Sequence, residues 1–166
     1  MNRLAAASVS MALVSAIATA AAAEQRCPMR TAVYGQESGY KLRFRPMEEL
    51  GASMAANAFL IDAPDREKPL LGWVLWNNGE SRPTGWAMLD CPQDAVTTED
   101  YADCTHWKGV MYALGEQDAA LLPGEDEPAP PAILLSDFGR QIRYSLVSDI
   151  GSETIPWDVF RLEGCD

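Results

Sequence analysis

Alternating apolar and polar positions indicate short β-strands along most of the chain. The densest apolar segment is 70–91, where apolar side chains fall on both faces of an extended strand: Leu71, Trp73 and Leu75 on one, Val74 and Trp76 on the other. That pattern is typical of a strand buried on two sides. Segment 77–85 is rich in Asn, Gly and Pro, so 86–89 is expected to return as the second strand of a hairpin with a polar loop. We expect the other elements to pack on this hairpin.

Further segments have the two-residue period of strands. They are 31–34, 40–45, 58–62, 107–114, 133–135, 141–147 and 157–162. Helical signals occur at two places, because Pro46 precedes two glutamates and apolar residues at helical spacing, and Thr97 offers a hydroxyl cap before carboxylates. About seven to eight short strands with one or two short helices predict a mainly β fold, a β-rich sandwich or a barrel-like domain.

Residues 1–23 have the composition of a secretory signal peptide. Arg3 is the only charged residue before Glu24, and an apolar run that ends in alanines follows it. A basic start, an apolar run and small residues at the cleavage site are the features of such a signal. The alternative, a retained membrane helix, is disfavoured because the run is Ala-rich and of borderline length. We therefore expect a periplasmic or secreted protein, not inserted in the membrane after cleavage, whose domain spans 24–166.

One segment of this domain has a biased composition. Residues 124–131 read Gly-Glu-Asp-Glu-Pro-Ala-Pro-Pro. Neither flank is large enough to stand comfortably as its own domain, so we expect an acidic, proline-rich loop within a single compact domain. Its carboxylates lack the alternating oxygen ligands and the central glycine of a calcium loop, which favours a solvated loop.

The chain is strongly acidic. It has 13 Lys and Arg residues and 24 Asp and Glu residues, which gives a formal net charge of −11. Removal of Arg3 with the signal peptide makes the net charge of the mature chain one unit more negative. Such a charge repels nucleic acid and anionic lipid, so we expect no nucleic-acid partner. It favours solubility and would speed encounters with a basic protein partner.

All four cysteines lie in the predicted mature chain. In an oxidising compartment an even count predicts two disulfides, and three pairings are possible. We expect Cys27 with Cys165, which ties the two ends of the domain, and Cys91 with Cys104, which closes a local acidic loop. The spacing is not that of a Cys-x-x-Cys metal or redox motif.

His106 is the only histidine, so any chemistry that needs an imidazole would use it. In a helix that continued past Cys104, Glu99, Asp103 and His106 would share one face. Such a face could ligate a divalent metal, or Asp103 could orient His106 as a general base. The competing interpretation, an ordinary helix start with solvated carboxylates, is better supported. The sequence has no Gly-x-Ser-x-Gly elbow and no phosphate-binding loop, and we expect no cofactor.

The chain has five tryptophans, which is many for its length. In strands of this kind most tryptophans are core residues. One or two could instead line a groove, and an exposed aromatic patch rimmed by acidic residues would be a binding surface. The sequence does not identify which tryptophan would form it.

These observations favour an exported, non-enzymatic binding or accessory domain that engages a protein or small ligand through loops at one end. One form of this hypothesis is a partner of a cationic envelope protein. The alternative is a small periplasmic hydrolase or metal-dependent enzyme centred on His106. A further alternative is a structural envelope protein, which would need an exposed apolar face or a sheet edge.

Overall fold

The structure is a computed structural model that describes residues 27–52, 54–92, 97–147 and 154–166. The predicted signal peptide, 1–23, lies outside these residues. The described strands are β1 (Ala32–Gly35), β2 (Lys41–Arg45), β3 (Asn57–Asp62), β4 (Leu70–Leu75), β5 (Thr84–Met88), β6 (Thr105–Leu114), β7 (Ala119–Leu121), β8 (Ala132–Leu135) and β9 (Val159–Cys165). The helical elements are the 3₁₀ turn η1 (Met29–Thr31), α1 (Thr98–Ala102), α2 (Phe138–Ile142) and the single-turn π-helix η2 (Arg143–Val147).

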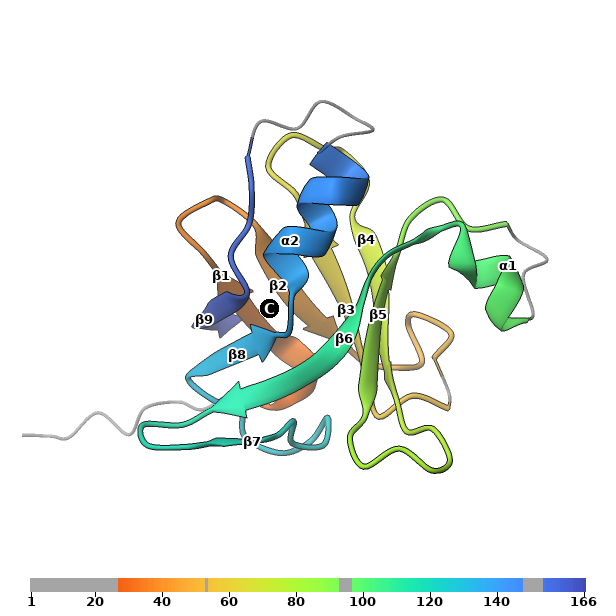
Figure 1. The fold of residues 1–166 in the computed structure, drawn as a ribbon. Helices are drawn as coiled ribbons and strands as arrows, with labels where there is room; N and C mark the ends of the chain where they lie inside the picture. The colour runs from red at the N-terminus through yellow and green to blue at the C-terminus, as the bar shows by residue number, and fades with distance from the viewer. Residues whose placement is uncertain (1–26, 53, 93–96, 148–153) are drawn as a thin grey trace, which may run out of the picture.

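Eight of these strands form a closed antiparallel barrel (Figure 1). Each strand pairs with the next along the chain from β1 to β6, β8 then pairs with β6, and β9 pairs with both β8 and β1. The short β7 pairs with the end of β6 beside this ring. The mainly β, barrel-like fold predicted from the sequence is confirmed, as a single compact domain.

Large side chains fill the barrel. An eight-stranded barrel is just wide enough for its interior to be packed by side chains or to hold one small ligand. Here the largest fully buried side chains are aromatic: Trp107, Tyr34, Tyr40, Phe44, Phe59, Phe138 and Phe160. The Phe59 ring lies against Gly72 so closely that a Cβ there would collide with it. The barrel wall is therefore a scaffold around a solid core.

Helix α2 closes one end of the barrel, the upper end in Figure 1. Its Phe138 ring makes edge-on contacts with the rings of Tyr40, Trp107 and Phe160. Ile142, one helical turn later, is also fully buried. The prediction of a strand at 141–147 is wrong because i, i+4 spacing lets both apolar residues face the barrel, whereas the alternation that suggested a strand leaves Tyr144 71% exposed.

The two predicted helix starts have different outcomes. Thr97 does cap α1: its hydroxyl accepts from the backbone N–H of Asp100, whose carboxylate accepts from the backbone N–H of Thr97. This reciprocal capping box satisfies two otherwise unpaired donors. The segment after Pro46 forms successive hydrogen-bonded turns instead of a helix. Gly51 adopts φ +66° there, a left-handed conformation that ends a helical turn.

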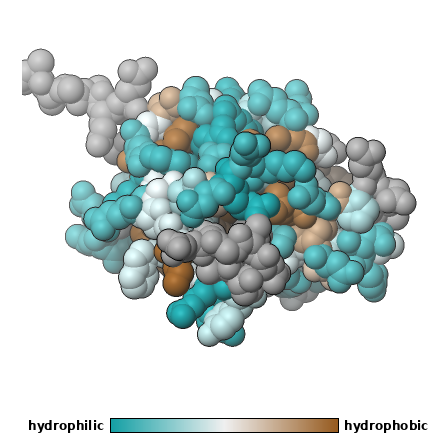
Figure 2. Space-filling model, turned by 90° about the horizontal axis from the view of Figure 1, so that it is seen from above, coloured by the Kyte–Doolittle hydropathy of each residue, from teal (hydrophilic) through white to brown (hydrophobic). Residues whose placement is uncertain are grey.

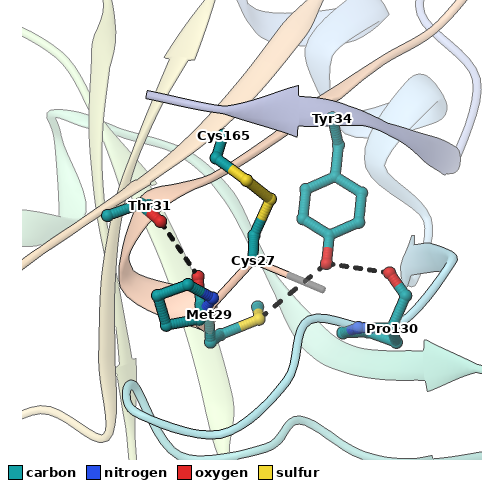
Figure 3. Close-up of a disulfide and its surroundings, with 7 residues drawn as sticks. Cys27, Met29, Thr31, Tyr34, Pro130 and Cys165 are labelled. Atoms are coloured by element: carbon teal, nitrogen blue, oxygen red, sulfur yellow. Dashed lines mark hydrogen bonds between the residues drawn. A yellow bond between two sulfur atoms is a disulfide. The ribbon is translucent and has the colours of Figure 1, made fainter. Parts of the chain in front are cut away.

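Both predicted disulfides are present, Cys27–Cys165 and Cys91–Cys104. The first joins the start of the described domain to the end of β9 (Figure 3). Beside it, the buried Tyr34 hydroxyl donates to the backbone oxygen of Pro130 at 3.0 Å. Burial without a charged partner raises the pKa of this hydroxyl well above its ordinary value.

The acidic loop 124–131 is held against the N-terminal segment. The backbone N–H groups of Met29 and Arg30 donate to the oxygens of Glu127 and Glu125, each at 2.9 Å, and that of Ala129 donates to Cys27 at 2.8 Å. An ion pair between Arg30 and Asp126 adds to these bonds. The loop is thus part of the wall beside the terminal disulfide.

The disulfides indicate an oxidising compartment, in which such bonds form and persist. Among the residues that the structure describes, no helix combines the length and apolar character that a membrane span requires.

Candidate functional site

The helical face predicted to carry Glu99, Asp103 and His106 does not form. Helix α1 ends at Ala102, and His106 lies in strand β6, where the register with β5 shifts. A helix cannot continue here because Cys104 is buried and bonded to Cys91 while Thr105 already pairs with Met88. In the described part of the chain, no three His, Cys, Asp or Glu side chains form a group that could hold a metal ion.

His106 instead contacts Ser145, which lies in η2. Its Nδ1 lies 3.3 Å from the Ser145 hydroxyl, which also donates to the backbone oxygen of His106 at 3.3 Å. A nucleophilic serine must give its proton to the imidazole. Here the backbone oxygen of His106 is a second acceptor for the Ser145 proton, and the contacts tie η2 to β6.

The tryptophans differ greatly in exposure. Trp107 is fully buried, and its indole N–H donates to the backbone oxygen of Ser136 at 2.9 Å. Trp73 and Trp86 pair across β4 and β5 and are half-buried. Trp76 and Trp157 are 56% and 76% exposed. The expectation that most tryptophans belong to the core is met in full only by Trp107.

Trp157 is exposed although its backbone is firmly held. The side-chain amide of Gln36 donates to the Trp157 backbone oxygen at 2.9 Å and accepts from its backbone N–H at 2.8 Å. The Gln36 amide is itself oriented, because its oxygen also accepts from the Ser38 hydroxyl at 2.7 Å. Both main-chain hydrogen-bonding groups of Trp157 are therefore satisfied while its indole projects into solvent.

The residues on either side of Trp157 are also fixed. The Asp158 carboxylate accepts from the backbone N–H of Gly139 at 2.7 Å, and its backbone oxygen accepts from Leu135 at 2.8 Å. The backbone oxygen of Pro156 lies so close to Gly139 that no Cβ would fit there. These contacts attach the Trp157 segment to both α2 and β8.

Two grooves meet at Trp157. We call the first the wall groove; it has a volume of about 680 Å³ and is lined by Gly35, Gln36, Glu37, Leu134, Trp157, Asp158, Val159, Arg161 and Glu163. The second, the helix groove, has a volume of about 400 Å³ and is lined by Gly139, Arg140, Arg143, Tyr144, Ile155, Pro156, Trp157 and Asp158. Together these residues form what we call the Trp157 surface.

The wall groove lies on the outer face of three strands. Val159 of β9 pairs with Leu134 of β8, and Arg161 pairs with Gly35 of β1, while Phe160 between them points into the core. The β1–β9 register skips Glu163, and its carboxylate packs over Gly35 and is ion-paired with Lys41. A bulge of this kind re-aims a side chain. It fixes a carboxylate on the groove.

The Trp157 surface is balanced in charge. It contains three arginines and three carboxylates: Arg140, Arg143, Arg161, Glu37, Asp158 and Glu163. Arg143 and Arg161 make no salt bridge with another described residue, whereas Arg140 lies 3.5 Å from Asp137. Figure 2 looks onto the α2 end of the molecule and shows a mainly hydrophilic face with small hydrophobic areas between. The acidity of the chain is therefore concentrated elsewhere.

A separate cleft lies between α1 and the barrel wall. It has a volume of about 380 Å³, and its apolar walls come from Leu71, Trp73, Met88 and Tyr101. The Tyr101 ring meets Trp73 edge-on at 6.0 Å. At its rim Lys68 donates to Asp90 at 2.7 Å, which lowers the pKa of that carboxyl. Tyr101 thus covers the apolar outer faces of β4 and β5.

Comparisons with known proteins find no matching family model, no matching curated protein and no matching solved structure.

Sequence reasoning missed the Trp157 surface for a definite reason. It placed Trp157 at the start of a strand, where it would alternate inward or outward, but β9 begins two residues later. Its exposure is set by Gln36, which is 121 residues away in the sequence. The only local signal was Pro156, which withholds a backbone donor just before Trp157.

Proposed function

We propose that this chain is an exported, non-enzymatic binding domain whose ligand docks on the Trp157 surface. The observation that carries the proposal is the pairing of a 76% exposed indole with a backbone held on both sides by Gln36. An indole exposed to this degree contributes little to the packing of the core.

A pre-positioned tryptophan suits binding for energetic reasons. Tryptophan, tyrosine and arginine dominate the few residues that carry most binding energy, and all three types occur here, in Trp157, Tyr144, Arg143 and Arg161. A side chain presented by a rigid backbone loses less conformational entropy when its ligand arrives. The Gln36 contacts therefore lower the cost of binding.

The acidic remainder of the molecule would act at longer range. The side chains of Glu99, Asp100 and Asp103 are exposed around α1, and the last turn of this helix contains no basic residue. A cationic envelope protein, the partner class expected from the net charge, would be attracted to this region and not to the charge-balanced Trp157 surface, and its association rate would fall steeply as salt is added.

Site-specific photo-crosslinking tests the proposal. The photoreactive residue p-benzoyl-phenylalanine replaces Trp157 in one variant and Trp76 in a matched control, because both side chains are exposed. Each purified variant is irradiated with envelope and secreted material of the source organism, and the products are separated by mass. We expect an adduct at position 157 and none at position 76.

The proposal fails if neither position yields an adduct, or if both yield the same adducts in equal amounts. The benzophenone inserts into C–H bonds of any ligand class, so the result does not depend on what the ligand is.

The enzymatic alternative has one favourable observation, the contact between His106 and Ser145. A serine hydrolase of this kind would be labelled at Ser145 by a fluorophosphonate probe, and Ser145→Ala would abolish the label. The binding proposal predicts no labelling. The further alternative, a structural envelope protein, gains no support from the described strands, because the barrel closes and β7 has only three residues.

A further inference from the structure

We infer that the ligand of the Trp157 surface is a neutral carbohydrate chain that lies along the wall groove and crosses Trp157. This inference rests on the proposed function and specifies its ligand. It follows from the shape of the site, its hydrogen-bonding groups and its charge.

The shape of the site favours an elongated ligand. The wall groove and the helix groove are both lined by Trp157 and Asp158, so they adjoin at these two residues. A compact small molecule would occupy one groove only, whereas a chain of sugar rings would use both.

The hydrogen-bonding groups favour sugar hydroxyls. Arg161 offers donors, while Glu37 and Glu163 offer acceptors, along a floor that contains Leu134 and Val159. A hydroxyl both donates and accepts, so it can pair with either kind. The C–H face of a pyranose ring is apolar and slightly positive, which matches the negative face of the Trp157 indole.

The strand pairing disfavours an extended peptide as the ligand. A peptide that adds to a sheet needs a free strand edge. At the wall groove, β9 is hydrogen-bonded to β1 on one side and to β8 on the other. A helical peptide would need an apolar groove, but this groove contains Glu37, Arg161 and Glu163.

The charge balance favours a neutral chain. The Trp157 surface holds three arginines and three carboxylates, in a chain of net charge −11. An acidic polysaccharide would be repelled at long range by the whole molecule, and a basic one would bind the acidic regions elsewhere.

A panel of oligosaccharides tests the inference. The probes are hexamers of β-1,4-glucan, β-1,3-glucan, α-1,4-glucan, mannan, galactan and chitin, with oligogalacturonate and oligoalginate as acidic counterparts. Binding is measured by calorimetry and by tryptophan fluorescence. We expect at least one neutral hexamer to bind, Trp157→Ala to weaken it roughly thirtyfold or more, as for a central anchor, and Trp76→Ala to leave it unchanged.

Two further variants test the groove itself. Glu37→Ala and Arg161→Ala each remove an exposed side chain from the wall groove, and both should weaken the same hexamer while thermal unfolding stays unchanged. The inference is overturned if no neutral hexamer binds, if only the acidic chains bind, or if Trp157→Ala has no effect. A polypeptide adduct at position 157 in the crosslinking experiment would overturn the carbohydrate while leaving the proposed function standing. Absence of any adduct would remove both.

Discussion

The Cys27–Cys165 disulfide should stabilise the fold more than the Cys91–Cys104 disulfide does. The perturbation is the paired substitution Cys27→Ala with Cys165→Ala, set against Cys91→Ala with Cys104→Ala. Paired substitutions leave no unpaired thiol of the broken bond to form a wrong disulfide.

The magnitude follows from the length of chain that each bond closes. The sequence separations are 138 and 13 residues. In the chain-entropy model the loss of disorder in the unfolded chain grows with the logarithm of the loop length, which gives about 5 kcal/mol for the terminal bond and about 3 kcal/mol for the local one. Because domains of this size are stable by roughly 5–15 kcal/mol, loss of the terminal bond would remove about a third or more of the free energy of unfolding.

Native-state packing supports the same order. Cys27 is buried at the start of a segment whose backbone pairs with the acidic loop, and Cys165 pairs with Ala32 at the end of β9. Losing this bond separates the segment at Cys27 from the end of β9, which leaves backbone hydrogen bonds alone to hold each of them. Losing the local bond releases α1, which makes few contacts with the barrel core.

Urea unfolding followed by circular dichroism measures both effects. The free energy of unfolding should fall by about 2 kcal/mol more in the terminal variant than in the local variant. Equal losses, or a larger loss in the local variant, would refute the argument that the length of the closed loop decides the order.

Four further predictions concern the core, the cap and the buried hydroxyl. Gly72→Ala should cost about 1–3 kcal/mol in urea unfolding, because the new methyl group meets the Phe59 ring, and an unchanged midpoint would contradict that packing. Phe138→Ala should cost about 3–5 kcal/mol, since it empties the plug at the α2 end of the barrel; a loss below about 1 kcal/mol would mean that the plug is dispensable. Thr97→Ala should cost about 1 kcal/mol of α1 stability, seen as faster amide exchange in α1 alone. The raised pKa of Tyr34 keeps its hydroxyl protonated in the folded state while the unfolded chain ionises near pH 10, so stability should fall as pH rises above about 10 and should fall less in Tyr34→Phe; parallel profiles would contradict this.

Much of the fold could be predicted from sequence because local rules and global packing agree. The strands β4 and β5 follow from the apolar alternation around Trp73, and the α1 cap follows from Thr97. An even cysteine count in a predicted exported chain gave two disulfides, and the observed pairs are the two expected ones. In each case a few neighbouring residues, or the spacing alone, carry the signal.

The predictions that are wrong lie where contacts between residues far apart in the sequence determine the structure. Segment 141–147 has the period of a strand. The Phe138 ring, however, packs against the rings of Tyr40, Trp107 and Phe160, and the chain forms helix α2 there. Tertiary packing of this kind overrides local periodicity. The helix expected to carry His106 ends early because the chain must enter β6.

The candidate site could not be predicted from the sequence for the same reason. The sequence indicated that one or two tryptophans could form a binding surface, but exposure is a property of the folded chain. The contacts of Trp157 with Gln36 and of Asp158 with Gly139 join separate parts of the sequence.

In the proposed function, Trp157 is the tryptophan that contacts the ligand. Fluorine NMR of protein labelled with 5-fluorotryptophan tests it directly, because the five tryptophans give separate signals that can be assigned by single Trp→Phe variants. On addition of envelope and secreted material of the source organism, we predict that the Trp157 signal shifts or broadens while the Trp107 signal stays in place. A Trp157 signal that stays in place while that of Trp73 moves would contradict the proposed function and locate binding at the α1 cleft.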